Sequence, residues 1–301
     1  MKNNTPMPNR LFINRHCRRA LLIGATASAL LVLGACTTLS SDEESTDGNP
    51  SFRQRMHVNV LNETTSEDIK AEINFGRDVA ARVLGRTAIQ KNKALNKYVS
   101  LIGTALAAHA NRAELQFHFG VLDSDDINAY STPGGYIFVT RGAVNLAENE
   151  AELAAILAHE IAHITERHIV DSLNIRATDA SGAAGLGRLI GAGTDTARVA
   201  FTQAIDEAVN ILFEKGYSQQ HELDSDRVAT LLLANAGYDP MALRQYLQRA
   251  HSVDHASESI NTTHPPSRQR LMSLDRLIKE EQLDQIQQAR NSARFNKYVI
   301  K

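Results

Sequence analysis

The stretch from His159 to His163 limits what this 301-residue chain can fold into more than any other, because it carries two histidines four residues apart. On an α-helix such residues lie about 40° and about 6 Å apart, so both imidazoles point to one side. Glu160 is turned around the helix from His159, where its carboxylate is better placed to hold a metal-bound water than to bind the metal. This spacing predicts a zinc site that activates water.

The residues before this stretch predict that it lies on a helix. Residues 149–157 are strong helix formers, and Glu150 and Glu152 suit the positive N-terminal end of a helix dipole. Apolar side chains cover a broad side of the helix and predict that it is buried: Leu153, Ile156, Leu157, Ile161 and Ile164. The alternative interpretation is a pair of core histidines satisfied by hydrogen bonds.

A second acidic segment predicts the third protein ligand. Glu222 and Asp226 are four residues apart and share one face of a helical stretch that continues through Val228 and Leu231. A catalytic zinc ion needs three protein ligands and an open position, and two histidines with one glutamate form such a set. We therefore expect Glu222 to bind the metal and Asp226 to accept the free N–H of a liganding histidine.

His168 is a rival third ligand. Nine residues after His159 correspond to about 900° of rotation, which places His168 on the opposite side of a continuous helix. It can reach the metal only if the helix breaks first. The metzincin spacing would put a third histidine at position 169, which is Ile169, and the glycine of that motif is absent. We therefore expect His168 not to bind the metal.

A histidine near the C-terminus lies on a segment that two prolines stiffen. Pro265 and Pro266 prevent a helix up to that point. Such a loop can hold His264 over a metal, either as a donor to the developing oxyanion or as a fourth ligand that closes the open position. Arg270 can anchor this loop or bind substrate. The alternative is an ordinary surface loop.

Several motifs follow one another in an order that resembles a known family. They are Asn128 to Tyr130, Pro133 to Gly142, His159 to His163, Glu222 to Asp226, Gly237 to Pro240 and His264 to Pro266. Over residues 65–274 the chain resembles the zinc metalloproteases of the HtpX and CAAX prenyl endopeptidase family, and within it the soluble periplasmic branch.

The resemblance implies a role for each site residue. His159, His163 and Glu222 would bind one zinc ion per chain, and Glu160 would be the general base. His264 and Arg270 would lie over the cleft, and the resting enzyme would be latent with His264 at or near the zinc ion. The family usually has alanine where this chain has Ser225, a change that leaves the ligand assignment intact.

The N-terminus predicts an export signal. Basic residues without an acid precede the apolar run of residues 20–35, which is too short for a comfortable membrane span. Residues 33–36 resemble the lipobox of bacterial lipoproteins, which implies a signal peptide over residues 1–35 and a lipid on Cys36. Thr37 favours the outer membrane over the inner one, because an aspartate there would be the inner-membrane signal. An ordinary cleaved signal and an uncleaved anchor are the alternatives.

Charge gives no support for a nucleic-acid-binding protein, and cysteine content gives none for a disulfide-stabilised domain. The chain carries 32 basic and 34 acidic residues, and loss of the five basic leader residues leaves a net charge of −7. This balance gives no reason to expect a nucleic-acid partner. The two cysteines, Cys17 and Cys36, lie in the leader region, so the remaining domain has no disulfide framework.

The rest of the sequence predicts an α+β fold, mostly helical and zincin-like, with a small β-sheet beside the helix of His159. We expect a flexible tether over residues 36–64, a metalloprotease domain over 65–280 and a polar tail over 281–301. Within the domain, helices are expected at 66–79 and 95–106, strands at 115–119 and 136–140, and a loop at the glycine-rich residues 181–193. The strand at 136–140 is expected to offer an open edge to extended polypeptide, with an internal strand as the alternative.

Together these features predict a zinc-dependent endopeptidase of the bacterial cell envelope that acts on extended or unfolded polypeptides. Misfolded or unassembled envelope proteins are the expected substrates, envelope assembly machinery is a possible partner class, and a lipid anchor is the expected membrane contact. The alternative is a zinc-stabilised chaperone or assembly factor whose closed site is not catalytic, since a closed zinc site uses the same residues.

Overall fold

The computed structural model describes residues 66–173, 194–252, 262–264, 268–286 and 288–299. The expected signal peptide with Cys36, the tether and the glycine-rich residues 181–193 lie outside the described residues. The described residues all belong to one compact unit. Its helices confirm the expected ones at 66–79 and 95–106, which are α2 (Ser66–Arg86) and α3 (Lys93–Ala107).

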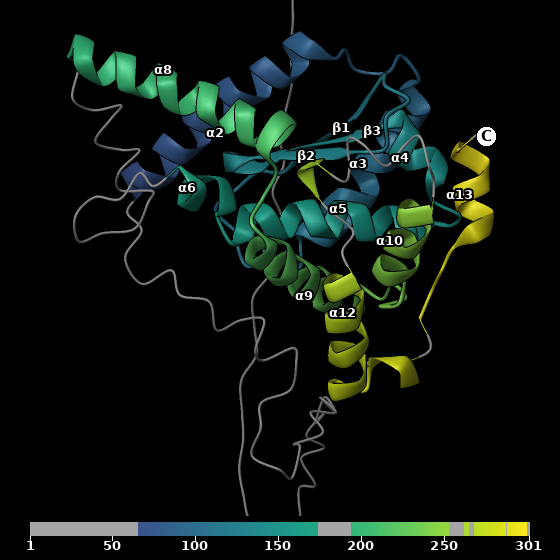
Figure 1. The fold of residues 1–301 in the computed structure, drawn as a ribbon. Helices are drawn as coiled ribbons and strands as arrows, with labels where there is room; N and C mark the ends of the chain where they lie inside the picture. Colours follow the sequence, from purple (N-terminus) through teal and green to yellow (C-terminus); the bar gives the residue numbers. More distant parts are fainter. Residues whose placement is uncertain (1–65, 174–193, 253–261, 265–267, 287, 300–301) are drawn as a thin grey trace, which may run out of the picture. The chain divides into compact units, whose positions relative to one another are not determined.

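A three-stranded sheet lies between two groups of helices (Figure 1). Strand β1 (His118–Leu122) runs parallel to β3 (Tyr136–Thr140), and β2 (Ala129–Thr132) runs antiparallel to β3, so the order is β1–β3–β2. The helices α2 and α8 (Asp195–Asn210) lie on one side, and α5 (Glu150–Thr165) with α9 (Gln219–Asn235) lies on the other. The predicted α+β, mostly helical fold is confirmed.

The alternation of side chains along β3 explains this layering. Ile137 and Val139 belong to the core shared with α3 and α5, whereas Phe138 belongs to a second core shared with α2 and α8. Because successive side chains of a strand point to opposite faces, one five-residue strand contributes to both cores. The remaining elements are the short turns η1 (Pro133–Gly135), η2 (Ile211–Lys215, a π-helical turn) and η3 (Leu283–Gln285), and the helices α4 (Arg141–Leu146), α6 (His168–Ser172), α10 (Ala242–Ser252), α12 (Arg268–Glu280) and α13 (Ser292–Tyr298).

Strand β3 has a neighbour on each side, so the expectation that it offers an open edge to polypeptide is wrong. Apolar side chains on both faces suit a central strand rather than an edge. The edge strand that packs on α5 is β2. Strand β1 also begins later than the expected strand at 115–119, because Leu115 N–H donates to Arg112 O (3.0 Å) and closes a turn there.

The helix α5 is buried along its length, from Glu150 to Ile164. It begins where the side chain of Asn149 accepts a hydrogen bond from Glu152 N–H (3.1 Å), which satisfies one of the free donors of the first turn. At its other end Arg112 donates to Ile164 O (3.1 Å). Both ends are therefore fixed by side chains from outside the helix.

Glu150 ties the start of α5 to three distant segments. Its carboxylate accepts hydrogen bonds from Tyr98 Oη (2.7 Å), Tyr238 Oη (2.9 Å) and Asn291 Nδ2 (3.1 Å) and forms an ion pair with Arg294. Burial opposes ionisation, but these donors outweigh it and lower the pKa of the Glu150 carboxyl. The charged carboxylate therefore holds α5, α3, the connection between α9 and α10, and α13 together.

Residues 281–301, expected to be a polar tail, contain two elements that pack onto the domain. Leu283 of η3 and Phe295 of α13 are fully buried, and Val299 is 5% exposed. The ring of Tyr298 stacks on Tyr98 at 4.5 Å between centroids. The stretch is mostly polar, but the fold buries three of its apolar residues, Leu283, Phe295 and Val299. Composition alone did not indicate this packing.

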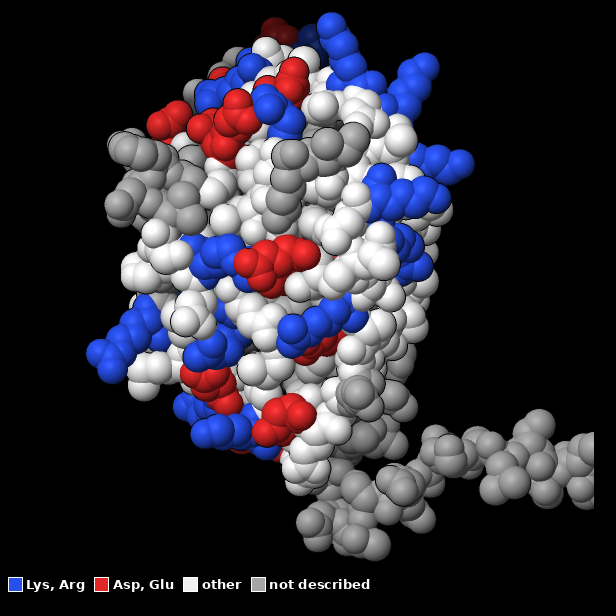
Figure 2. Space-filling model, turned by 90° about the vertical axis from the view of Figure 1, so that its right-hand side faces the viewer, with Lys and Arg blue, Asp and Glu red and all other residues white. Residues whose placement is uncertain are grey.

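None of the helices in the described ranges combines the length and the hydropathy that crossing a bilayer requires. On the face shown in Figure 2, lysine and arginine side chains lie among aspartate and glutamate side chains. On this face charges of both signs are therefore interspersed.

We expect Phe295→Ala to lower the free energy of unfolding by about 3–5 kcal/mol, because it leaves a cavity in the main core. The matched control is Asn296→Ala, an exposed neighbour on α13 whose loss costs about 0.5 kcal/mol or less. Chemical denaturation followed by circular dichroism measures both. Equal stability of the two variants would show that α13 does not pack on the domain.

Candidate metal centre

Helices α5 and α9 bring the predicted metal ligands together. The Nε2 atoms of His159 and His163 are 3.0 Å apart, and the carboxylate oxygens of Glu222 lie 3.4 Å from the first and 3.3 Å from the second. A ring nitrogen of His264 joins them, so that four possible ligand atoms lie within 4.8 Å of one another. All four side chains are buried.

The spacing of these atoms fits a tetrahedral metal ion. Ligand atoms about 2.0–2.1 Å from zinc lie about 3.3 Å from one another at the corners of a tetrahedron, close to the separations found here. The lone pairs of the nitrogens of His159 and His163 repel one another unless a proton or a cation lies between them. The residues present therefore fit a metal ion, and their roles as zinc ligands stay predictions.

Asp226 and Arg270 hold these ligands from behind. Asp226 Oδ1 lies 3.1 Å from Nδ1 of His159, so Asp226 is next to the ring whose N–H it is expected to accept. Burial lowers the pKa of His159, but contact with Asp226 and Glu222 outweighs it and raises that pKa to about 9. Burial likewise opposes ionisation of Glu222 and Asp226, yet Arg270 lowers both pKa values.

The guanidinium of Arg270 connects two carboxylates of the centre to the main chain of His264. Its Nε and Nη2 each donate to Asp226 at 2.7 Å, and Nη1 lies 2.6 Å from Glu222 Oε2. The same Nη1 donates to the main-chain oxygen of His264 at 3.1 Å. Arg270 is 1% exposed, so these contacts favour the anchoring role over substrate binding, the two roles that the sequence left open.

His168 lies beside the centre although it is not one of the four converging residues. The helix α5 ends before Arg167, whose φ of 57° is left-handed, and this break turns His168 back toward α5. Its Nδ1 lies 2.9 Å from Nδ1 of His163 and 3.2 Å from Oγ of Ser225. Burial lowers the pKa of His168 to about 3, so the ring is neutral and can accept the N–H of His163.

Two further residues contact the centre, and sequence reasoning missed their roles. Ser131 on β2 donates to Glu160 Oε2 at 2.7 Å, which orients the expected general base. The ring of Tyr217 stacks on that of His163 at 3.9 Å between centroids. Ser131 follows the motif of Asn128 to Tyr130, so its neighbourhood could have drawn attention to it. The sequence carries no signal for the stacking of Tyr217.

The segment that carries His264 closes over the centre. His264 is 6% exposed, and its Nδ1 lies 3.0 Å from Glu222 Oε1 while its Nε2 lies 3.8 Å from Glu160 Oε1. Tyr217 N–H donates to Thr263 O at 3.3 Å. Gly216, with φ of 70°, permits this packing, because a Cβ there would lie 2.3 Å from the oxygen of Thr262.

The space beside Glu160 and His264 is small. A cavity of about 30 Å³ adjoins them, also lined by Asn128 and Ile156. It has room for about two water molecules but not for a peptide. The structure is therefore that of a closed centre.

Comparison with known proteins places this geometry in a family. Residues 93–278 match peptidase family M48. The chain is 28% identical over 212 residues to the beta-barrel assembly-enhancing protease of Escherichia coli (strain K12), covering 67% of this chain and 43% of that protein. It is 31% identical over 208 residues to the putative beta-barrel assembly-enhancing protease of Vibrio cholerae, covering 65% and 42%.

A eukaryotic relative is more distant. The chain is 26% identical over 190 residues to the mitochondrial metalloendopeptidase OMA1 of Schizosaccharomyces pombe, covering 62% of this chain and 54% of that protein. The chain spans less than half the length of the two bacterial relatives. The family match includes α5 and α9, which carry the converging residues, and it confirms the family predicted from the ordered motifs. The chain therefore belongs to peptidase family M48, and its compact unit is a metalloprotease domain of that family.

Proposed function

We propose that this chain is a zinc-dependent endopeptidase. The observation that carries the proposal is the convergence of His159, His163 and Glu222 within a buried centre, with Glu160 on the same helix facing the adjoining cavity. Two histidines and a glutamate are a known ligand set of catalytic zinc sites, which keep one position open for water or substrate. A purely structural histidine pair would not need a carboxylate at such a cavity.

In this proposal zinc, when bound, supplies Lewis-acid polarisation of water and of the scissile carbonyl. Glu160 takes a proton from the attacking water and passes it to the leaving amine. The hydrogen bond from Ser131 fixes the carboxylate for this transfer. Asp226 and His168 hold the two liganding imidazoles in the orientation and tautomer that expose Nε2.

The substrate is a polypeptide in extended form, bound beside β2. That strand is an edge of the sheet, packs on α5 and carries Ser131 in contact with Glu160. The four residues of β2 are buried, so a chain would run alongside β2, past the general base, only after the centre opens. Binding through main-chain hydrogen bonds selects unfolded or loosely folded polypeptide over small molecules.

The proposed setting is the bacterial cell envelope, with misfolded or unassembled envelope proteins as substrates. The support is the similarity to proteins named for enhancing beta-barrel assembly, together with the leader sequence. Anchoring to the outer membrane through a lipid on Cys36 belongs to the same proposal.

One observation favours a second candidate function. Because His264 joins the three ligands, the centre as it stands has four possible protein ligands and resembles a closed structural site. A zinc-stabilised chaperone or assembly factor would have this arrangement permanently. An enzyme would have this four-ligand arrangement only in a latent state, and His264 would move away when substrate binds.

We expect Glu160→Gln to keep about one zinc ion per chain while hydrolysis of an unfolded casein substrate falls by about a hundredfold or more, since the general base is lost. Zinc content and initial rates measure the two effects. The matched control is Glu67→Gln, an exposed residue of α2. Full activity of Glu160→Gln would contradict the mechanism, and absence of hydrolysis in the unaltered protein would favour the chaperone. The same variant can trap envelope substrates for identification.

We expect His264→Ala to raise hydrolysis by about tenfold or more with zinc retained, because a minor open state is commonly populated at about 10% or less. The matched control is His251→Ala, an exposed histidine of α10. Rates and zinc content are measured together. A fall of about ten- to a thousandfold would instead assign His264 the role of oxyanion donor.

We expect His168→Leu to weaken zinc binding by about ten- to a hundredfold, because His163 loses the acceptor for its N–H. His168→Asn places an amide oxygen near the position of Nδ1 and should restore most of the affinity. Competition with a chromophoric chelator measures the affinity, and the visible spectrum of the cobalt form reports the ligand geometry. Equal affinity in both variants would show that the contact does not orient His163.

A further inference from the structure

Strand β1 forms the edge of the sheet opposite to β2 and leaves part of its main chain open. Gln90 N–H donates to Val121 O (2.8 Å), and Val121 N–H donates to Asn96 Oδ1 (2.9 Å), so the main-chain groups of Val121 point away from β3. Alternate residues of a strand direct these groups the same way, so those of Phe119 also point outward. No hydrogen bond among the described residues engages the main-chain groups of Phe119, whereas residues 88–90 already pair with the later part of β1, from Val121 onward.

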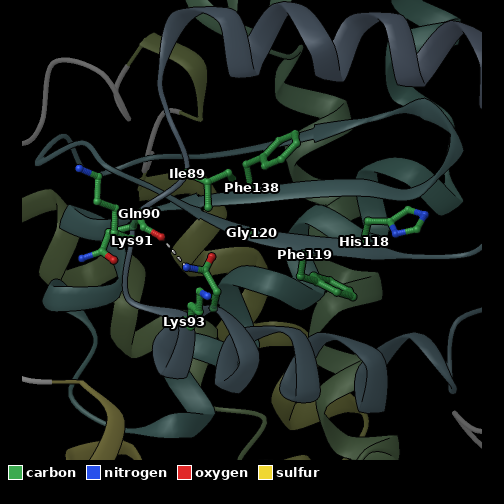
Figure 3. A pocket seen from close by; sticks show the side chains of 9 residues that line it. Ile89, Gln90, Lys91, Lys93, His118, Phe119, Gly120 and Phe138 are labelled. Atoms are coloured by element: carbon green, nitrogen blue, oxygen red, sulfur yellow. Dashed lines mark hydrogen bonds between the residues drawn. The ribbon is translucent and has the colours of Figure 1, made fainter.

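A hollow of about 620 Å³ adjoins this open edge (Figure 3). Its volume lies within the about 300–1,000 Å³ typical of ligand sites. In Figure 3, Ile89 and Phe138 lie on one side of β1, and Phe119 and Lys93 lie on the other. Ile89 is 40% exposed, which is unusual for a large apolar side chain in this structure. The hollow therefore offers apolar surface and a main-chain edge together.

The charge of the hollow is positive. Lys91 and Lys93 line it, both exposed, and no carboxylate is among its lining residues. Neither lysine forms an ion pair within the described part of the chain, whereas Arg82 and Arg86 on the nearby α2 pair with Asp206 and Glu214. Two unpaired ammonium groups beside an apolar surface favour an occupant that carries carboxylates.

We infer that the hollow beside β1, called the groove from here on, is a second polypeptide-binding site. It holds an extended, acid-bearing segment by adding it as a strand to β1. Successive side chains of such a segment point to opposite faces. One residue would place an apolar side chain against Ile89 and Phe138, and the next would place a carboxylate at Lys93. The site thus selects segments in which apolar and acidic residues alternate.

The inference rests on the proposed function only in naming the bound polypeptide as substrate. The two edges of the sheet, β1 and β2, are two strand spacings apart, or about 10 Å. A loosely folded polypeptide can occupy both, and binding at β1 raises its effective concentration beside Glu160. A folded protein, whose strands are already paired, gains neither contact.

The test uses the full chain carrying Glu160→Gln, so that no probe is cleaved. The probe is a fluorescein-labelled seven-residue peptide of alternating valine and glutamate, and fluorescence anisotropy measures its affinity. We expect Lys91→Glu with Lys93→Glu to weaken binding by about tenfold or more, since attraction becomes repulsion. The control, Lys70→Glu with Lys97→Glu, changes the net charge equally at exposed lysines outside the groove and should bind as before.

Three altered peptides test the mode of binding. A peptide with lysine in place of glutamate should not bind. Two further peptides carry N-methyl groups, one on the valine residues and the other on the glutamate residues. One of these two should not bind, because methylation removes the main-chain donors that face β1. If the variant at Lys70 and Lys97 loses as much affinity as the variant at Lys91 and Lys93, the effect comes from net charge alone. If both methylated peptides bind fully, strand addition is excluded. Either result overturns the inference.

The outcomes separate this inference from the proposed function. If the groove binds the peptide but the unaltered protein hydrolyses no polypeptide, the endopeptidase proposal fails and the binding site stands. If the protein hydrolyses casein but the peptide binds equally with or without the substitutions at Lys91 and Lys93, the groove is not a binding site and the inference fails alone.

Discussion

The buried pairing of Arg270 with Asp226 and Glu222 is the interaction on which the centre depends. The carboxylates of Glu160, Glu222 and Asp226 are at most 2% exposed, and Arg270 contacts the last two of them. Unpaired buried charge costs several kcal/mol. Arg270 alone does not neutralise three carboxylates, so the charges that make the centre costly also favour a proton on His159 or, in its place, a metal ion.

The two histidines expected to bind the metal have different partners behind their rings, and this difference would affect the chemistry of the site. Nδ1 of His159 faces the carboxylate of Asp226, whereas Nδ1 of His163 faces the neutral ring of His168. A carboxylate raises the basicity of the imidazole that it accepts from, and a neutral acceptor does so less. A bound metal would therefore keep more positive charge than with two carboxylate partners, which makes it a stronger Lewis acid.

Local periodicity predicted the parts of the site that lie on single helices. The nearness of His159 to His163 on α5, and of Glu222 to Asp226 on α9, follows from 3.6 residues per turn. The expected position of His168, opposite the metal ligands, and the expected open edge of β3 were wrong because both depend on long-range packing. The left-handed Arg167 turns His168 toward His163 across a break that no helix signal marks. The central place of β3 arises because its two apolar faces meet helices that are distant in sequence.

In the proposed function, the closed centre and the open edge of β1 would have separate tasks, and both would favour unfolded polypeptides over folded proteins. The cavity beside Glu160 has room for about two waters, so the proposed cleavage would require displacement of the segment that carries His264. The groove at Phe119 is open in the same structure and can bind first. Because each strand addition needs an unpaired backbone, only a polypeptide that has lost or not yet formed its own pairing can satisfy both edges. Selectivity for unfolded chains then follows from main-chain hydrogen bonding rather than from recognition of particular side chains at the metal.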